Sequence, residues 1–269
     1  MKRLFVCTLM LIAALGSYAQ CGSINNAIQA GEELHYKLKF NWKFIWVNVG
    51  WANMTVNNYK HNGIDCFKTD LESYTNKRAD SFFKMRDTLT SITTLDLEPL
   101  YFRKAAEEGS RYSVDEVKFS YSDGKCIVDQ TRLHKGVLKS AHDESTNCVY
   151  DMLSILLQAR SYDPTNYKPG TKILFSMATG KEVERQTLVY RRKEVYKAED
   201  GVKYRCLVFS LVEKNKKGEE EEVITFYITD DLNHMPVRLD LYLSFGSAKA
   251  FLTEIKGNRH PLTCIVEDD

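Results

Sequence analysis

The chain has 269 residues and a formal net charge of +1, with 12% aromatic residues, 14 glycines and five prolines. A chain of this length can bury a substantial core and is long enough for one large β domain. The near-neutral charge argues against the broad basic surface of a nucleic-acid-binding protein, so no nucleic-acid partner is predicted. The aromatic content, with few glycines and prolines, favours strands over disorder.

Residues 1–20 have the layout of a secretory signal peptide. A positively charged start precedes an apolar run over residues 4–15, and Ser17 and Ala19 offer small side chains to a signal peptidase. The apolar run is too short to cross a bilayer. The sequence therefore predicts an exported protein of the periplasm or outer envelope, whose residues 21–269 form a single β-rich domain.

After export, two states of Cys21 are possible: a lipidated cysteine, or an unmodified cysteine in a soluble protein. A lipoprotein signal usually has a small residue directly before the cysteine that is lipidated, whereas this chain has Gln20 at that position. Acyl chains on Cys21 would anchor the protein firmly in a membrane. Because of the mismatch at Gln20, the sequence favours a soluble product over lipidation of Cys21.

The mature chain is predicted to be a succession of strands. Residues 34–40 alternate apolar and polar side chains with a period of two. Residues 44–56 form a second, aromatic-rich strand in which Gly50 marks a bulge or kink. Asn-Gly, Asp-Gly and Lys-Gly turn signals separate several of the later strands. These strands are predicted at residues 64–74, 80–94, 99–106, 117–121, 126–131, 187–198, 202–212, 222–229, 236–245 and 248–255.

One helix interrupts this pattern at residues 148–160. Apolar residues recur at helical spacing from Val149 to Leu157, and Pro164 blocks continuation of the helix. Because the helix is apolar on most sides, it is predicted to be buried. The predicted fold is mainly β: an antiparallel, strongly curved sheet or half-barrel in two sheet halves that wraps this one helix.

Six of the seven cysteines remain after the signal peptide is lost, and they permit up to three disulfides in an oxidising compartment. Cys66 and Cys206 lie inside strand patterns, where a buried free thiol is as good an interpretation as pairing. The first and last strands of a nearly closed sheet tend to meet. The sequence therefore predicts a disulfide between Cys21 and Cys264.

No motif in the sequence points to a reaction. No histidine pair has the spacing of a zinc protease, and the chain has no C-x-x-C, glycine-rich phosphate loop or G-x-S-x-G. Ser81 and Lys84 match the S-x-x-K of penicillin-recognising enzymes, but that motif requires a helix start and Ser81 falls in a strand pattern. We therefore expect a protein that is not an enzyme, with no catalytic residues, metal or cofactor.

Three short segments resemble a known family. They are residues 31–36 (GEELHY) at the first strand, residues 150–154 (YDMLS) on the helix and residues 236–239 (PVRL) in a late strand. Over nearly the whole mature chain, the protein resembles the exported bacterial proteins of the domain of unknown function 3108 family. The resemblance implies a periplasmic or envelope β-protein and implies no activity.

Two functions of different classes remain open. Curved sheets can hold a ligand where side chains do not fill the interior. The leading interpretation is a non-enzymatic carrier of an apolar or amphipathic ligand, such as a lipid or acyl chain, by fold analogy to periplasmic lipoprotein carriers. The candidate ligand-binding residues are Trp46, Trp51, Leu153 and Leu156. The alternative is a structural or assembly protein that presents its sheet to an envelope protein partner.

Overall fold

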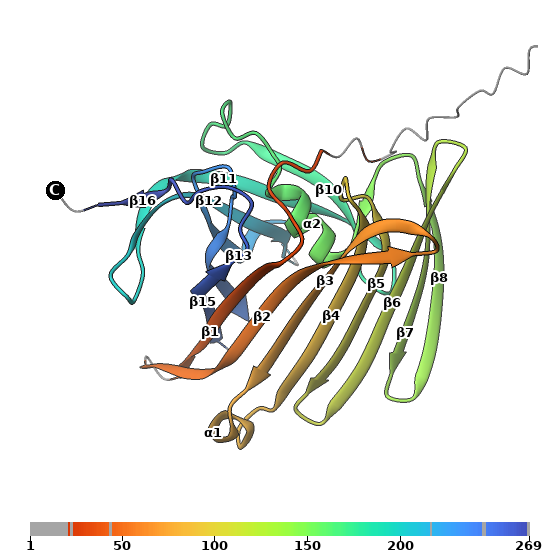
Figure 1. Cartoon of the computed structure of the whole chain (residues 1–269). Coiled ribbons are helices and arrows are strands. Elements are labelled where there is room, and N and C mark those ends of the chain that lie inside the picture. The colour runs from red at the N-terminus through yellow and green to blue at the C-terminus, as the bar shows by residue number, and fades with distance from the viewer. Residues whose placement is uncertain (1–20, 22–23, 43–44, 216, 244–245, 268–269) are drawn as a thin grey trace, which may run out of the picture.

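The computed structural model describes residues 21, 24–42, 45–215, 217–243 and 246–267. The predicted signal peptide lies outside the described residues. Figure 1 shows the elements. The strands are β1 (Glu32–Trp42), β2 (Ile45–His61), β3 (Ile64–Thr75), β4 (Met85–Thr94), β5 (Pro99–Glu108), β6 (Arg111–Ser122), β7 (Lys125–His134), β8 (Val137–Ser145), β9 (Val149–Tyr150), β10 (Lys172–Ala178), β11 (Val183–Lys197), β12 (Lys203–Lys214), β13 (Glu220–Thr229), β14 (Pro236–Leu243), β15 (Gly246–Lys256) and β16 (Ile265–Val266). The helices are α1 (Lys77–Asp80) and α2 (Met152–Ala159).

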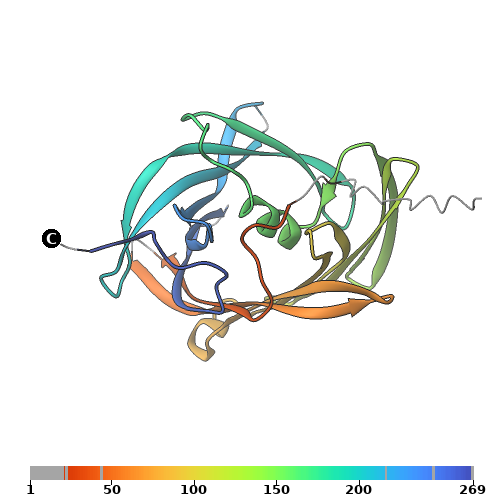
Figure 2. The same ribbon diagram turned by 45° about the horizontal axis from the view of Figure 1, so that its top comes forward.

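All described strands belong to one sheet with the order β8-β7-β6-β5-β4-β3-β2-β1-β15-β14-β13-β12-β11-β10-β9, and β16 pairs with β12. Pairing is antiparallel except between β9 and β10. The two ends of the sheet curl towards each other (Figure 2), and the Gly180 N–H donates a hydrogen bond to the Gln130 side chain of β7 at 2.9 Å. The predicted mainly-β fold with a strongly curved antiparallel sheet is confirmed.

Tight turns and one bulge shape the first part of the sheet. Asn62-Gly63 and Asp123-Gly124 have positive φ at both residues, as the two-residue hairpin turns predicted there require. The pairing of β1 with β2 shifts register where Leu38 faces Gly50. A Cβ atom at Gly50 would come within 2.0 Å of the Tyr74 carbonyl oxygen. Gly50 therefore permits close strand contact beside a bulge, as predicted.

Helix α2 is shorter than the predicted range of 148–160. The Asp151 carboxylate accepts hydrogen bonds from the backbone N–H groups of Leu153 and Ser154, and the Asp151 N–H donates to the Ser154 hydroxyl. This reciprocal capping box begins the helix at Met152. The two residues before the cap, Val149 and Tyr150, instead form strand β9 beside β10.

Helix α2 packs on what we call the inner face of the sheet, the face that carries Leu34 and Met54. Leu157 lies in one core cluster with these two residues. Leu153 lies in a second cluster with residues of β4 to β7 such as Val117. Met152 is exposed, so the helix is buried along one side rather than on most sides. Figure 2 shows the sheet curving towards the side that carries α2.

A buried ion pair fixes the end of α2. The Arg160 guanidinium donates to both carboxylate oxygens of Glu32 at 2.5 and 2.8 Å, and its Nε donates to the Asn233 carbonyl at 3.0 Å. The two charged side chains are 1% and 0% exposed. Arg160 thereby joins the helix to β1 and to the connection between β13 and β14.

The structure joins Cys21 to Cys148 and leaves the other four described cysteines as buried free thiols. The predicted Cys21–Cys264 disulfide is therefore wrong. The premise was correct in part, because β1 and β15 do pair. However, Cys264 lies beyond β15, and its carbonyl oxygen accepts a hydrogen bond from the Arg205 N–H of β12 at 2.8 Å. Cys21 instead reaches the connection between β8 and β9.

Candidate functional site

Away from α2, the inner face carries an apolar surface that the helix does not cover. Cross-strand pairs connect Leu38 and Phe40 of β1, through β15, to rows of apolar side chains on β14, β13, β12 and β11. We call the partly buried members of these rows the apolar belt: Leu38, Phe40, Leu188, Leu211, Ile224, Phe226, Leu239 and Leu241. Residues of β1 nearer α2, such as Leu34 and Tyr36, are fully buried. The belt thus packs in part on the core, with Leu38 and Leu239 against one cluster and Leu188 and Phe226 against another, and keeps part of its apolar surface accessible to solvent.

Strands β4 to β7 carry ionisable groups on the same face. Direct pairing places Lys104 opposite Asp115, and Asp115 opposite Arg132. The Arg132 Nε lies 3.2 Å from Asp115 Oδ1, and the Lys104 Nζ lies 3.7 Å from Glu108 Oε1. We call this group the charged wall: Asp87, Lys104, Glu108, Asp115 and Arg132. Because both signs are present in near balance, the wall presents a polar surface rather than a field of one sign.

Burial perturbs two carboxyl groups of the charged wall. Burial, together with the negative charge of Glu108, raises the pKa of Asp87 to about 6. Burial also raises the pKa of Asp115, against the opposing effect of Arg132. The Asp87 Oδ1 atom is buried and has no hydrogen-bond partner among the described residues. A buried polar atom without a partner is costly in a fold, and carboxyl groups with perturbed pKa values cluster at functional sites.

Asp87→Asn is expected to stabilise the protein more at pH 8 than at pH 4. The folded-state pKa is raised, so folding takes up a proton between about pH 4 and 6, and the cost of burying the charged form is complete above that window. The gain at pH 8 should be about 1–3 kcal/mol. Urea unfolding at both pH values measures it. Equal destabilisation at the two pH values would contradict the assignment.

Trp46 and Trp51 do not reach the inner face. The bulge beside Gly50 places Trp46 opposite Asn41 and Trp51 opposite Lys37, on the outer face. The tryptophans are 38% and 40% exposed. The Lys249 Nζ lies 4.5 Å from the centre of the Trp46 ring, and the Trp51 and Tyr74 rings are 5.9 Å apart. The structure thus separates the tryptophans from any site on the inner face.

The two candidate residues on α2 have different surroundings. Leu153 is buried in the core cluster beneath the helix. Leu156 is partly buried and packs against the cluster that contains Leu34 and Met54. Leu153 therefore holds the helix in place, and Leu156 lies at the margin of the packed region.

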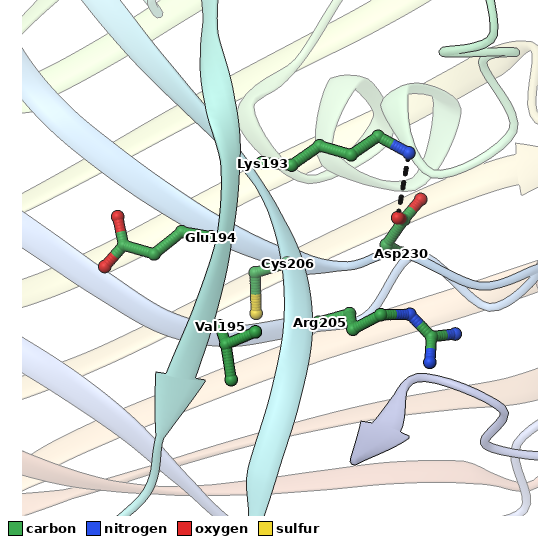
Figure 3. A pocket seen from close by; sticks show the side chains of 6 residues that line it. All are labelled: Lys193, Glu194, Val195, Arg205, Cys206 and Asp230. Atoms are coloured by element: carbon green, nitrogen blue, oxygen red, sulfur yellow. Dashed lines mark hydrogen bonds and ion pairs between the residues drawn. The ribbon is translucent and has the colours of Figure 1, made fainter.

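A small pocket of about 220 Å³ lies beside β11 and β12 (Figure 3). Its lining residues are Lys193, Glu194, Val195, Arg205, Cys206 and Asp230. Lys193 and Asp230 form an ion pair at 3.0 Å. Burial raises the pKa of the Cys206 thiol to about 12. Because the thiolate is the reactive form, Cys206 is unsuited to nucleophilic chemistry at neutral pH. The pocket therefore has no reactive thiolate at neutral pH, and its Lys193 and Asp230 side chains already pair with each other.

The described residues contain no group of three or more His, Cys, Asp or Glu side chains that could hold a metal ion. No helix within the described ranges is long and apolar enough to cross a membrane. Ser81 is the C-cap of α1, and Lys84 forms an ion pair with Glu107 at 2.8 Å. The S-x-x-K match therefore lies at the end of a short helix and not at the helix start that the enzymes require.

Comparison with known proteins places the chain in a family. No curated protein matches it. A beta-barrel-like protein of the domain of unknown function DUF1849 from Brucella abortus shares the fold, with a TM-score of 0.55 and 10% identity over 84% of this chain and 96% of that one. A protein described as exported, with a YmcC-like fold, from Bacteroides fragilis matches at a TM-score of 0.31 and 10% identity over 87% of this chain and 100% of that one.

The family model DUF3108, described as a protein of unknown function, matches residues 34–253. This range extends from within β1 to within β15 and so covers both the apolar belt and the charged wall. The chain therefore belongs to the DUF3108 family.

Proposed function

We propose that this protein binds an amphipathic molecule, such as a lipid or acyl chain, on the inner face of its sheet. The observation that carries the proposal is the apolar belt. Its eight large apolar side chains stay partly accessible on a curved face that α2 covers near Leu34 and Met54. Exposed apolar surface of this kind marks a site for an apolar partner. Leaving it uncovered costs free energy that a bound chain would recover.

The charged wall supports an amphipathic ligand over a purely apolar one. Lys104 and Arg132 are part-buried cations that could contact a polar head group, while the unsatisfied Asp87 oxygen could accept a hydrogen bond from it. Pockets for small molecules commonly combine an apolar lining with a few such polar groups. The proposal involves binding without a catalytic step.

An exported location outside the cytoplasm belongs to the same proposal. The Cys21–Cys148 disulfide is the kind of bond that persists in oxidising compartments. It also bears on lipidation, because a sulfur atom that is joined to Cys148 cannot carry a lipid. The disulfide therefore favours a mature protein without an acyl anchor at Cys21.

The alternative, a structural or assembly role, has one observation in its favour. Trp51 and Tyr74 form a half-exposed aromatic pair on the outer face. Aromatic side chains of this kind are enriched in protein interfaces. In this alternative, a protein partner would bind the outer face and the inner face would bind no ligand.

Phe226→Ala is expected to weaken the binding of a fluorescent acyl probe about tenfold, because the belt would lose a large part of its contact area. Titration of the probe with the mature protein measures the affinity. Tyr242→Ala is the matched control, because Tyr242 is an exposed aromatic residue of neighbouring β14, one position along from the belt residue Leu241. Failure of the unmodified protein to bind any acyl probe, or equal weakening by both variants, would exclude the inner-face site and favour the structural alternative.

A further inference from the structure

One end of the sheet gathers exposed apolar side chains. In an antiparallel sheet, alternate connections lie at the same end. The connections β3–β4, β5–β6 and β7–β8 therefore share the end that carries α1, opposite α2, with the adjoining strand ends of β1, β2, β14 and β15 (Figure 1). The connections β10–β11 and β12–β13 turn at the same end, further round the curled sheet. We call the part formed by strands β1 to β8, β14 and β15 the docking end. It presents the exposed apolar residues Ile45, Phe82, Tyr112, Leu138 and Leu243. Phe82 is 79% exposed, which is the highest value among the exposed large apolar side chains.

The aromatic residues are distributed unevenly between the two ends. Seven exposed aromatic side chains lie at the docking end: Trp46, Trp51, Tyr74, Phe82, Phe83, Tyr112 and Tyr242. At the opposite end, the connections β2–β3, β4–β5 and β13–β14 and their flanking residues expose the aliphatic residues Ile64, Leu95 and Leu232 and one aromatic residue, Tyr59. Tryptophan, tyrosine and phenylalanine are the side chains that proteins place at membrane–water interfaces. The pattern at the docking end is therefore that of an interfacial surface.

Cations without ion pairs lie between these aromatic residues. Lys77 and Arg78 are exposed on α1, Arg111 follows the β5–β6 turn and Lys135 lies in the β7–β8 turn. No ion pair among the described residues involves any of these four cations.

The neighbouring acidic groups are already neutralised by other partners. Asp80 is held by Arg86 at 2.6 Å, and Glu107 by Lys84 at 2.8 Å. These four cations thus give the docking end a local positive charge that can meet a negatively charged partner, while the exposed Glu219 and Glu221 lie further round the sheet in the β12–β13 hairpin. Each lysine or arginine near an anionic membrane surface strengthens binding about fivefold.

We propose that the docking end binds the surface of a bilayer that contains anionic phospholipid. The aromatic side chains would enter the interface while Lys77, Arg78, Arg111 and Lys135 contact phosphate groups. Charge complementarity selects this partner over a neutral surface. The proposal goes beyond ligand binding on the inner face and does not depend on it. If both hold, the uncovered part of the inner face would lie towards the membrane, because α2 closes the other end.

Sedimentation of the mature full-length chain with vesicles tests the proposal. Binding to vesicles of phosphatidylethanolamine and phosphatidylglycerol should exceed binding to phosphatidylcholine vesicles, and added salt should weaken it. Phe82→Ser should reduce the partition coefficient about tenfold. The double variant Lys77→Gln/Arg78→Gln should reduce it about 25-fold, from the fivefold effect of each cation. All the exchanged side chains are exposed, and thermal melting checks that each variant is folded.

The opposite end supplies matched controls. Leu232 is 67% exposed in the β13–β14 connection, and Lys168 is exposed before β10. Leu232→Ser and Lys168→Gln should leave vesicle binding unchanged. The proposal is overturned if the unmodified protein does not bind anionic vesicles, which is the result expected if this surface binds a protein partner instead. It is also overturned if the control variants weaken binding as much as the docking-end variants do. Acyl-probe titration without vesicles reports on the inner face separately, so failure of one proposal is distinguishable from failure of the other.

Discussion

Replacing Arg160 by methionine is expected to lower the free energy of unfolding by about 3–5 kcal/mol. The substitution keeps most of the side-chain volume but leaves the Glu32 carboxylate fully buried without its partner. It also removes the hydrogen bond to the Asn233 carbonyl, so α2 loses its connection to the β13–β14 segment. Urea unfolding of the mature protein, followed by circular dichroism, measures the loss.

The double variant Glu32→Gln/Arg160→Met distinguishes the loss of the ion pair from the cost of leaving the buried Glu32 carboxylate without a partner. Because most of the penalty comes from the uncompensated carboxylate, the double variant should recover part of the stability. Lys60→Ala is the matched surface control, since the Lys60–Asp65 pair is exposed and should contribute less than about 1 kcal/mol. A loss below 1 kcal/mol in Arg160→Met would show that the pair is accessible to water.

Removing the Cys21–Cys148 disulfide is expected to cost about 4–5 kcal/mol. The bond spans 127 positions of the chain, so its loss increases the conformational freedom of the unfolded state over nearly half of the protein. It also ties the segment before β1 to the β8–β9 connection. The variant Cys21→Ser/Cys148→Ser should therefore unfold at a lower urea concentration than the unmodified protein.

Reductant provides the control for this measurement. Dithiothreitol should lower the stability of the unmodified protein to that of the double variant and should leave the double variant unaffected. Peptide mapping under non-reducing conditions should recover Cys21 joined to Cys148, with Cys264 as a free thiol. A peptide that joins Cys148 to any other cysteine would contradict the pairing.

Much of the fold follows from short-range patterns. The alternation over residues 34–40 predicts β1, and Asn62-Gly63 predicts the β2–β3 hairpin, because strand pleating and two-residue turns depend on neighbouring residues. The helix position follows from the same kind of pattern, but its start does not. The capping box of Asp151 and Ser154 begins α2 at Met152, and a spacing argument that considers only apolar residues extends the helix too far.

The candidate site is harder to predict because it combines strands that are distant in sequence. The charged wall draws residues from β4 to β7, and the apolar belt joins β1 to β11–β14 through β15. A single-residue bulge also decides which side chains reach the inner face. The bulge opposite Leu38 leaves Trp46 and Trp51 on the outer face, although aromatic content alone made them candidates for a ligand site. Register errors of one residue reverse every side chain of a strand.

By itself, the sequence determined the mainly-β class, many strand positions, the presence of helix α2 and the family resemblance, because these depend on local periodicity and on short motifs, but it missed α1, β8 and β10. Only the tertiary structure decided that Cys21 pairs with Cys148, that Glu32 and Arg160 meet across 128 positions, and that the belt and wall share one face. These contacts depend on where the curled sheet brings distant strands together. Local propensity carries no information on how the sheet curls, because the curled sheet depends on the pairing of β1 with β15, which are far apart in the sequence.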